Sequence, residues 1–302
     1  MIKRVIETVI AIAALSIAAS AQTITKSQDY SAFTTIEVGD SFNVSFRPSL
    51  EGNYMAEWTI DSILEEYVEV YVKNRTLFVN LDERAMNKDK EVKNAYKGKD
   101  AKKPVLNVII KVPTFITLKL SENAVVDAMG TNFENNEFNL EVAGNAKVNN
   151  LSVTAKTATV KLQKNANVTM NLEANDLTVN MESNSALSLN QKTMNLNINT
   201  EDNANLTLTG SANSVVLGMR NSSKLNFSGS ASALEVNSQE RSELEATRFP
   251  VKDLTVKMKG NSKVYSSVTN NLTLEMDGAT LEFSGNPEIK ITNLNKATIL
   301  HK

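Results

Sequence analysis

Few residues of this chain have the types and spacing that enzymatic catalysis requires. The only histidine is His301, beside the last residue, and the 302 residues include no cysteine. A Ser/His/Asp triad, a cysteine nucleophile and a histidine-based metal site therefore find no candidates in the body of the sequence. We predict no catalytic residue, no cofactor and no metal ligand.

Carboxylates offer a different chemistry, the cleavage of polysaccharides by a β-helical lyase or glycosidase. Such an enzyme needs carboxylates gathered on one face, beside basic or aromatic groups that hold a sugar. Here the outward carboxylates are scattered over several positions of the repeat, and Lys119 shares the position of Glu141. Mixed charges are typical of a solvated strand face, so the enzyme is the alternative interpretation. The carboxylates are Glu141, Glu201, Asp202, Glu235, Glu240, Glu243, Glu275 and Asp277.

The segment 82–104 is the most strongly charged part of the chain. Its residues 86–103 hold seven lysines against only three acidic residues, Asp89, Glu91 and Asp100. A charge run of this kind is usually a solvated loop. The functional interpretation is an anion-binding arm for acidic glycans or phosphate-bearing surface lipids. The lysines are Lys88, Lys90, Lys93, Lys97, Lys99, Lys102 and Lys103.

A repeat determines which elements would carry these side chains. An alternating apolar stretch, a polar corner and a small residue recur ten times between residues 118 and 300, with LEVAGNAKV and VKMKGNSKV as clear copies. Successive corners are 18 to 22 residues apart, a period typical of a solenoid. The corner residues, called anchors below, are Asn123, Asn145, Asn165, Asn184, Asn203, Ser222, Arg241, Asn261, Ala279 and Ala297.

The alternation inside each repeat indicates the kind of solenoid. Apolar residues lie seven, five and three places before an anchor, and polar residues lie between them, which is the period of a half-buried strand. The sequence predicts an all-β fold, a single-stranded right-handed parallel β-helix of about ten regular coils. We expect two or three strands of about four residues per coil, and right-handed winding because parallel crossovers are almost always right-handed. One buried column should hold Leu140, Val160, Val179, Ile198, Leu217, Val236 and Val256.

Six of the ten anchors are asparagine, and an alanine, serine or threonine always follows the anchor. Asparagine tolerates the left-handed conformation of tight corners, and its amide can bond to the asparagine of the next coil. We predict a structural corner ladder and small side chains that point inward. The ladder would comprise Asn123, Asn145, Asn165, Asn184, Asn203 and Asn261.

The first 21 residues have the pattern of a signal peptide. Lys3 and Arg4 precede an apolar run, and Ala19-Ser20-Ala21 is a small-x-small cleavage pattern. We expect export to the periplasm or the cell surface, no lipid anchor because no cysteine follows, and no membrane-spanning segment. A formal net charge of −2 argues against nucleic acid as a partner. Surface glycans or envelope proteins are the expected partners.

Residues 22–115 are predicted to form an irregular N-terminal β cap and first coils, interrupted by 82–104. Residues 116–302 belong to the same domain as regular repeats. Within the cap, FTTIEV, FNVSF, YVEVYV, TLFVNL and VLNVIIKV are predicted strands, TIDSILEE a short helix, and Trp58 a core residue. Asp61-Ser62-Ile63 resembles a bacterial O-glycosylation acceptor, but a helix N-cap at Asp61 is the favoured interpretation.

The runs FTTIEVGDSFNVSF, VIIKVP leading into LKLSENA, and GNAKV resemble the exported bacterial family called putative auto-transporter adhesin, head GIN domain. The likeness spans about residues 30 to 300. It implies a right-handed parallel β-helix exported to the cell envelope, a non-catalytic scaffold or adhesin, and no catalytic residues. The chain departs from the family pattern by its lysine-rich insertion and by asparagine or alanine where a glycine often occupies the corner.

Overall fold

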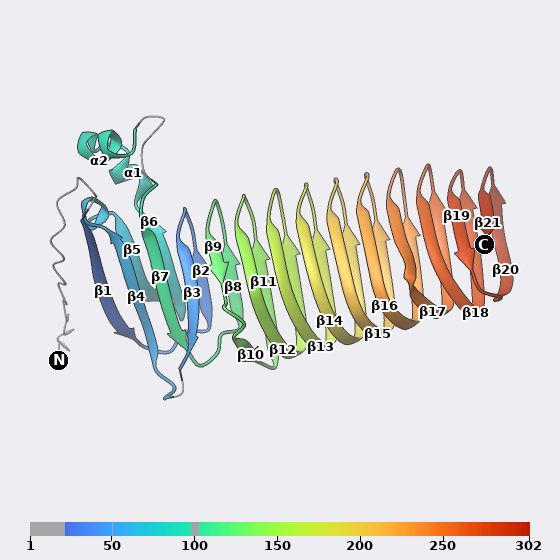
Figure 1. Ribbon diagram of the computed structural model, residues 1–302, viewed down its shortest axis with the longest axis horizontal. Coiled ribbons are helices and arrows are strands. Elements are labelled where there is room, and N and C mark those ends of the chain that lie inside the picture. The colour runs from blue at the N-terminus through green and yellow to red at the C-terminus, as the bar shows by residue number, and fades with distance from the viewer. Residues whose placement is uncertain (1–21, 50, 98–102) are drawn as a thin grey trace.

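The computed structural model describes residues 22–49, 51–97 and 103–302. The predicted signal peptide, Lys99 and Lys102 lie outside these ranges. The described chain is a long stack of β coils, with two short helices at one end and the C-terminus at the other (Figure 1).

The regular part is a stack of coils in which each coil is one long, bent strand. Every such strand pairs in parallel with the strands before and after it. The long strands are β12 (Lys147–Leu162), β13 (Asn167–Met181), β14 (Ala186–Thr200), β15 (Asn205–Met219), β16 (Lys224–Ser238), β17 (Glu243–Lys259) and β18 (Lys263–Asp277). The predicted parallel β-solenoid is confirmed, and its handedness stays a prediction.

The expectation of several short strands per coil was wrong for these seven coils. In β13 the alternation of buried and exposed residues slips once, at Asn175 and Asp176, which are both exposed. The backbone remains extended through that bend, so one strand supplies both walls of the coil. The two walls enclose one core of buried side chains.

Shorter strands complete the coils at both ends of the stack. The early ones are β2 (Thr35–Val38), β3 (Asn43–Pro48), β8 (Thr117–Leu120), β9 (Val125–Asp127), β10 (Asn132–Glu134) and β11 (Glu137–Val142). The last ones are β19 (Thr280–Ser284), β20 (Glu288–Asn295) and β21 (Thr298–His301).

The N-terminal region adds antiparallel strands to the parallel stack. β4 (Tyr54–Asp61) lies between β1 (Thr23–Tyr30) and β7 (Leu106–Val112) and is antiparallel to both. β5 (Val68–Lys73) forms an antiparallel pair with β6 (Thr76–Leu81). β7 and β6 then pair in parallel with β3 and β2 and so join the solenoid. All five predicted strands of this region are present.

The predicted core column is confirmed. Its seven members pair in register from coil to coil, as Val160 does with Val179, and each has no exposed surface. Trp58, 9% exposed, belongs to the same core. In the first coils Phe46, Phe115 and Phe133 pack with ring centroids 4.6 to 5.4 Å apart.

The corners differ from the expectation in one respect. The residue before each of the ten anchors has a positive φ, for example 55° at Glu122 and 61° at Lys164, whereas among the anchors only Asn184, Asn203 and Ser222 do. Primed β-turns require positive φ at their first central residue, which explains the shift by one position. The small residues after the first eight anchors point inward as predicted and are completely buried. The prediction was wrong at the last two corners, where Thr280 is half-buried and Thr298 is exposed, and the anchor Ala279 is buried instead.

Candidate functional site

The lysine-rich segment is folded onto the N-terminal region, and the expectation of a solvated loop was wrong for its described part. It contains the helices α1 (Glu83–Met86) and α2 (Lys90–Ala95). Val92 of α2 is 3% exposed and belongs to the hydrophobic core. One apolar residue in the polar run thus attaches the segment to the body of the protein.

Asp89 fixes the start of α2. Its Oδ1 accepts hydrogen bonds from the backbone N–H groups of Glu91 (2.7 Å) and Val92 (3.3 Å), and its Oδ2 accepts one of 2.6 Å from the Tyr67 hydroxyl. The Tyr67 hydroxyl first, and then the two N–H groups, lower the pKa of the Asp89 carboxyl. The same contact raises the pKa of Tyr67 to about 12.

A second contact holds the far end of α2. The Tyr96 hydroxyl donates a 2.8 Å hydrogen bond to Oδ2 of Asp61, which also accepts from the N–H of Val105 at 3.0 Å. Burial first, and then this hydrogen bond, raise the pKa of Tyr96. Asp61 itself is only 3% exposed. Asp61 does not cap the predicted helix, which is reduced to the 3₁₀ turn η1 (Ser62–Leu64). Its side chain instead accepts the hydrogen bond from Tyr96 of the lysine-rich segment.

Three predicted lysines lie together as a result. Lys90, Lys93 and Lys97, called the lysine cluster below, line an open depression of about 430 Å³ together with Asn94 and Tyr96. Among the described residues, no carboxylate forms an ion pair with any of the three. Lys88 and Lys103 are exposed elsewhere in the segment, outside this depression.

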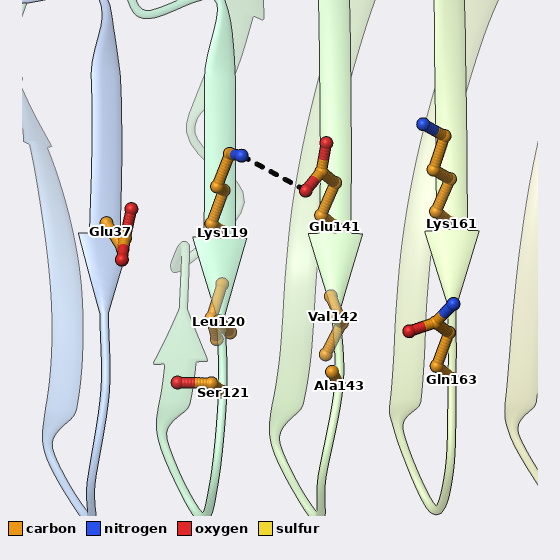
Figure 2. A pocket seen from close by; sticks show the side chains of 9 residues that line it. All are labelled: Glu37, Lys119, Leu120, Ser121, Glu141, Val142, Ala143, Lys161 and Gln163. Atoms are coloured by element: carbon orange, nitrogen blue, oxygen red, sulfur yellow. Dashed lines mark ion pairs between the residues drawn. The ribbon is translucent and has the colours of Figure 1, made fainter.

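A second depression, of about 420 Å³, lies on the outer face of the early coils. Figure 2 shows Glu37, Lys119, Glu141 and Lys161 side by side on β2, β8, β11 and β12. The Lys119 ammonium is 3.2 Å from a Glu141 carboxylate oxygen. Opposite charges alternate along the row, and Lys119 lies between the two carboxylates, Glu37 and Glu141, so they are not adjacent.

The same row of outward side chains continues into a third depression, of about 440 Å³. Asn180, Asn199 and Asn237 line it, and Gly218 leaves a gap in the row between the last two. Glu201 also borders this depression. The surface is polar, shallow and rich in amides.

One carboxylate pair was not anticipated from the sequence. Asp40, at the corner after β2, accepts a 2.6 Å hydrogen bond from the N–H of Leu81 and lies beside Glu83 of α1. The charge of Asp40 is the largest cause of the raised pKa of Glu83, and burial, a hydrogen bond to Asp40 and the charge of Glu122 add to it. These residues line none of the three depressions, and the described chain contains no group of three or more His, Asp or Glu residues arranged to hold a metal. Asp40 and Glu83 are 43 positions apart in the chain, and no spacing rule links a corner to such a distant helix, so only the fold reveals the pair.

The asparagine anchors are joined over three corners. The Asn145 amide donates to Asn123 Oδ1 at 3.1 Å, and the Asn165 amide donates to Asn145 Oδ1 at 3.0 Å. In the described part of the chain, no side-chain hydrogen bond links Asn184, Asn203 or Asn261 to a neighbouring anchor. At Asn184 the backbone N–H donates forward to Asp202, whereas that of Asn165 donates back to Gly144. The direction of this backbone hydrogen bond therefore differs between the corner at Asn165, where the asparagine side chains are linked, and the corner at Asn184, where they are not.

His301, the only histidine of the chain, packs against the last coils. Its ring stacks on Phe283 with centroids 4.8 Å apart, and Nε2 is 2.7 Å from the carbonyl oxygen of Gly285.

These features define a class, an elongated β-solenoid with shallow polar surfaces and a lysine-bearing helix fixed at one end. The sequence pattern of the family "Putative auto-transporter adhesin, head GIN domain" matches residues 32–201 and 179–287. The chain belongs to this family.

Several solved structures are similar to this chain at low sequence identity. The chain is similar to a putative adhesin from Parabacteroides merdae (17% identity, 93% of this chain and 96% of that chain, TM-score 0.49). It is also similar to a putative adhesin from Parabacteroides distasonis (15%, 93% and 98%, 0.48) and to a putative lipid binding protein from the same species (14%, 93% and 96%, 0.45). No curated protein matches the chain significantly. None of the described helices has the length and apolar character to cross a membrane.

Proposed function

We propose that this protein is a non-catalytic, exported cell-envelope protein that attaches to acidic glycans through the lysine cluster of α2. Membership of an adhesin-type family supports a binding function at a surface. The signal-peptide pattern of residues 1–21 supports export to the periplasm or the cell surface.

The observation that carries the proposal is the anchoring of the lysine cluster. Contacts at Asp89, Val92 and Tyr96 hold both ends and the middle of α2, so the backbone that carries the three lysines needs little further ordering when they bind. A ligand that meets preorganised groups loses less of its binding free energy to ordering. The protein as a whole carries a net charge of −2, so this positive surface is local. Carboxylated or sulfated sugars complement it by charge.

A lyase or glycosidase remains the alternative, and no specific observation favours it. The carboxylates of the early coils alternate with lysines, and the Asp40 and Glu83 pair lies outside the three depressions. Several predicted carboxylates have structural partners, as Glu235 does in its 3.1 Å contact with Lys257. Lys257 is the largest cause of the lowered pKa of Glu235.

A glycan array tests the proposal, together with a reducing-end release assay on the same polysaccharides. We expect the protein from residue 22 onward to bind acidic glycans and to release no reducing ends. The variant Lys90→Gln/Lys93→Gln/Lys97→Gln should lose this binding. A matched control replaces Lys147, Lys224 and Lys263, three exposed lysines in one row of the solenoid wall, by glutamine. Equal loss in both variants, or release of reducing ends, would overturn the proposal.

A further inference from the structure

The end of the stack opposite α2 exposes part of the hydrophobic core. β20 pairs with β18 and β21 pairs with β19, and no other described strand pairs with either of them, so each has an open edge. Ile289 and Ile291 continue the buried columns of Leu272 and Leu274. They are 47% and 57% exposed, whereas Leu272 and Leu274 have no exposed surface. β20 and β21 are called the end coil below.

The opposite end of the stack has an edge strand of a different kind. β1 is an antiparallel strand that carries Lys26 and Gln28 among its partly buried residues. The Lys26 ammonium is paired with Glu65 at 2.7 Å. Charged residues on an edge strand discourage further pairing. The end coil has the opposite character, since Leu294 also extends a buried column, that of Met276, and is 39% exposed.

We propose that the end coil is an interface with a second copy of this chain, in which β20 pairs antiparallel with β20 of that copy. The pairing would continue the sheet, satisfy the open edge and cover the exposed ends of the core columns. Because the two surfaces are identical, the interface is two-fold and closed, and it yields a dimer.

The charges of β20 fit this arrangement. When Ile289 lies opposite the partner's Leu294, the apolar side chains of both copies meet on the inner face. Lys290 then lies opposite the partner's Asn293, and Glu288 opposite the partner's Asn295, one position from the partner's Lys296. No like charges face each other, and the terminal acid of each strand approaches a basic residue of the other.

The two ends of the molecule do not complement each other, which favours a dimer over an open filament. In a head-to-tail stack β20 would meet β1, an antiparallel edge strand whose partly buried residues include Lys26 and Gln28, so the parallel stack would not continue.

Such a dimer would carry one α2 at each outer end, because α2 and the end coil lie at opposite ends of the stack (Figure 1). This consequence rests on the proposed function. Two lysine clusters facing away from each other would let one dimer bridge two anionic surfaces. The dimer would also bind a single surface with avidity when that surface is flexible enough to contact both clusters. The dimer itself does not depend on that function.

Light scattering on a sizing column, over a range of micromolar concentrations, tests the interface. We expect the protein from residue 22 onward to reach a plateau at twice the mass of one chain. Ile291→Lys should remain a monomer at every concentration, because it places a charge in the centre of the contact. The matched control is Met194→Lys, because Met194 is also 57% exposed but lies on the side of the stack. This control should dimerise as the parent does.

A crosslink provides a second readout that does not depend on a destabilising charge. The chain has no cysteine, so the double variant Lys290→Cys/Asn293→Cys adds the only thiols. Residues opposite each other in an antiparallel pair are close enough for a disulfide. We expect a covalent dimer on mild oxidation. A parent protein that stays monomeric, a mass that grows without a plateau, or a dimer in which these thiols do not crosslink would overturn the proposal. Glycan binding that fails while dimerisation persists would reject only the proposed function.

Discussion

The Tyr67 hydroxyl and the Asp89 carboxylate lie 2.6 Å apart and connect the residue before β5 with the first turn of α2. The same carboxylate caps the helix through two backbone N–H groups. One acidic residue thus orients a helix that carries Lys90 and Lys93 and precedes Lys97. The position of the lysine cluster depends on this contact.

Asp89→Ala should weaken binding to acidic glycans several-fold although it removes a negative charge next to the cluster. Loss of the cap and of the Tyr67 contact would let α2 open more often, which hydrogen exchange of the Val92 and Lys93 amides should report as faster exchange. Tyr67→Phe removes only one of the three hydrogen bonds and should have a smaller effect. Stronger binding by Asp89→Ala would show that local charge matters more than the fixed position of the helix.

Glu83→Gln should raise the melting temperature at neutral pH. Asp40 raises the pKa of Glu83 in the folded protein, so the folded state holds this proton more tightly than the unfolded chain does. Stability therefore falls as the pH rises through that pKa, and glutamine removes this loss. The gain should disappear in acid, below the ordinary pKa of a glutamate. The exposed corner residue Glu182, changed to glutamine, is the control and should show no such pH-dependent gain.

Ile198→Ala should lower the free energy of unfolding by about 2–5 kcal/mol, the usual cost of truncating a buried isoleucine. Ile198 is completely buried between Val179 and Leu217 in the core column. Asn197→Ala, one residue earlier on the outer face, should change stability by less than about 0.5 kcal/mol. Chemical denaturation of both variants measures the difference, and similar losses would contradict the assignment of inner and outer faces.

Asn145 and Asn184 should respond differently to substitution, although both are anchors. Asn145→Ala removes two amide hydrogen bonds and should cost about 1 kcal/mol, and glycine at this position should not restore the loss. Asn184 has a φ of 63°, so alanine there should cost about 1 kcal/mol through strain, and glycine should restore most of it. Thermal melts of the four variants distinguish the two causes. Identical patterns at both corners would show that one mechanism operates throughout.

The inner columns of the solenoid could be predicted from the sequence because a strand alternates strictly between two faces. The column from Leu140 to Val256 follows from that alternation and from the near-constant repeat length. The bend at Asn175 was not predictable as part of one strand, since two consecutive polar residues also occur in turns.

The lysines could be identified from the sequence, but their arrangement could not. Asp89 followed by Glu91 and Val92 has the composition of a helix start, but it lies inside a dense run of charged residues that is typical of a loop. The contacts that hold α2 join residues 22 and 35 positions apart in the chain, as Tyr96 and Asp61 show. No spacing rule links such residues, because the fold of the N-terminal region alone brings them together.

The most direct test of the central claim is the binding of an acidic polysaccharide to immobilised protein at low and at high salt. We predict binding by the parent protein that weakens steeply as the ionic strength rises, because exposed charges are screened within about 10 Å at 0.1 M salt. The triple glutamine variant of the lysine cluster should bind at least about tenfold more weakly at low salt and show little further dependence on it. Binding by the parent protein that is indifferent to salt, or that survives in the triple variant, would contradict the account.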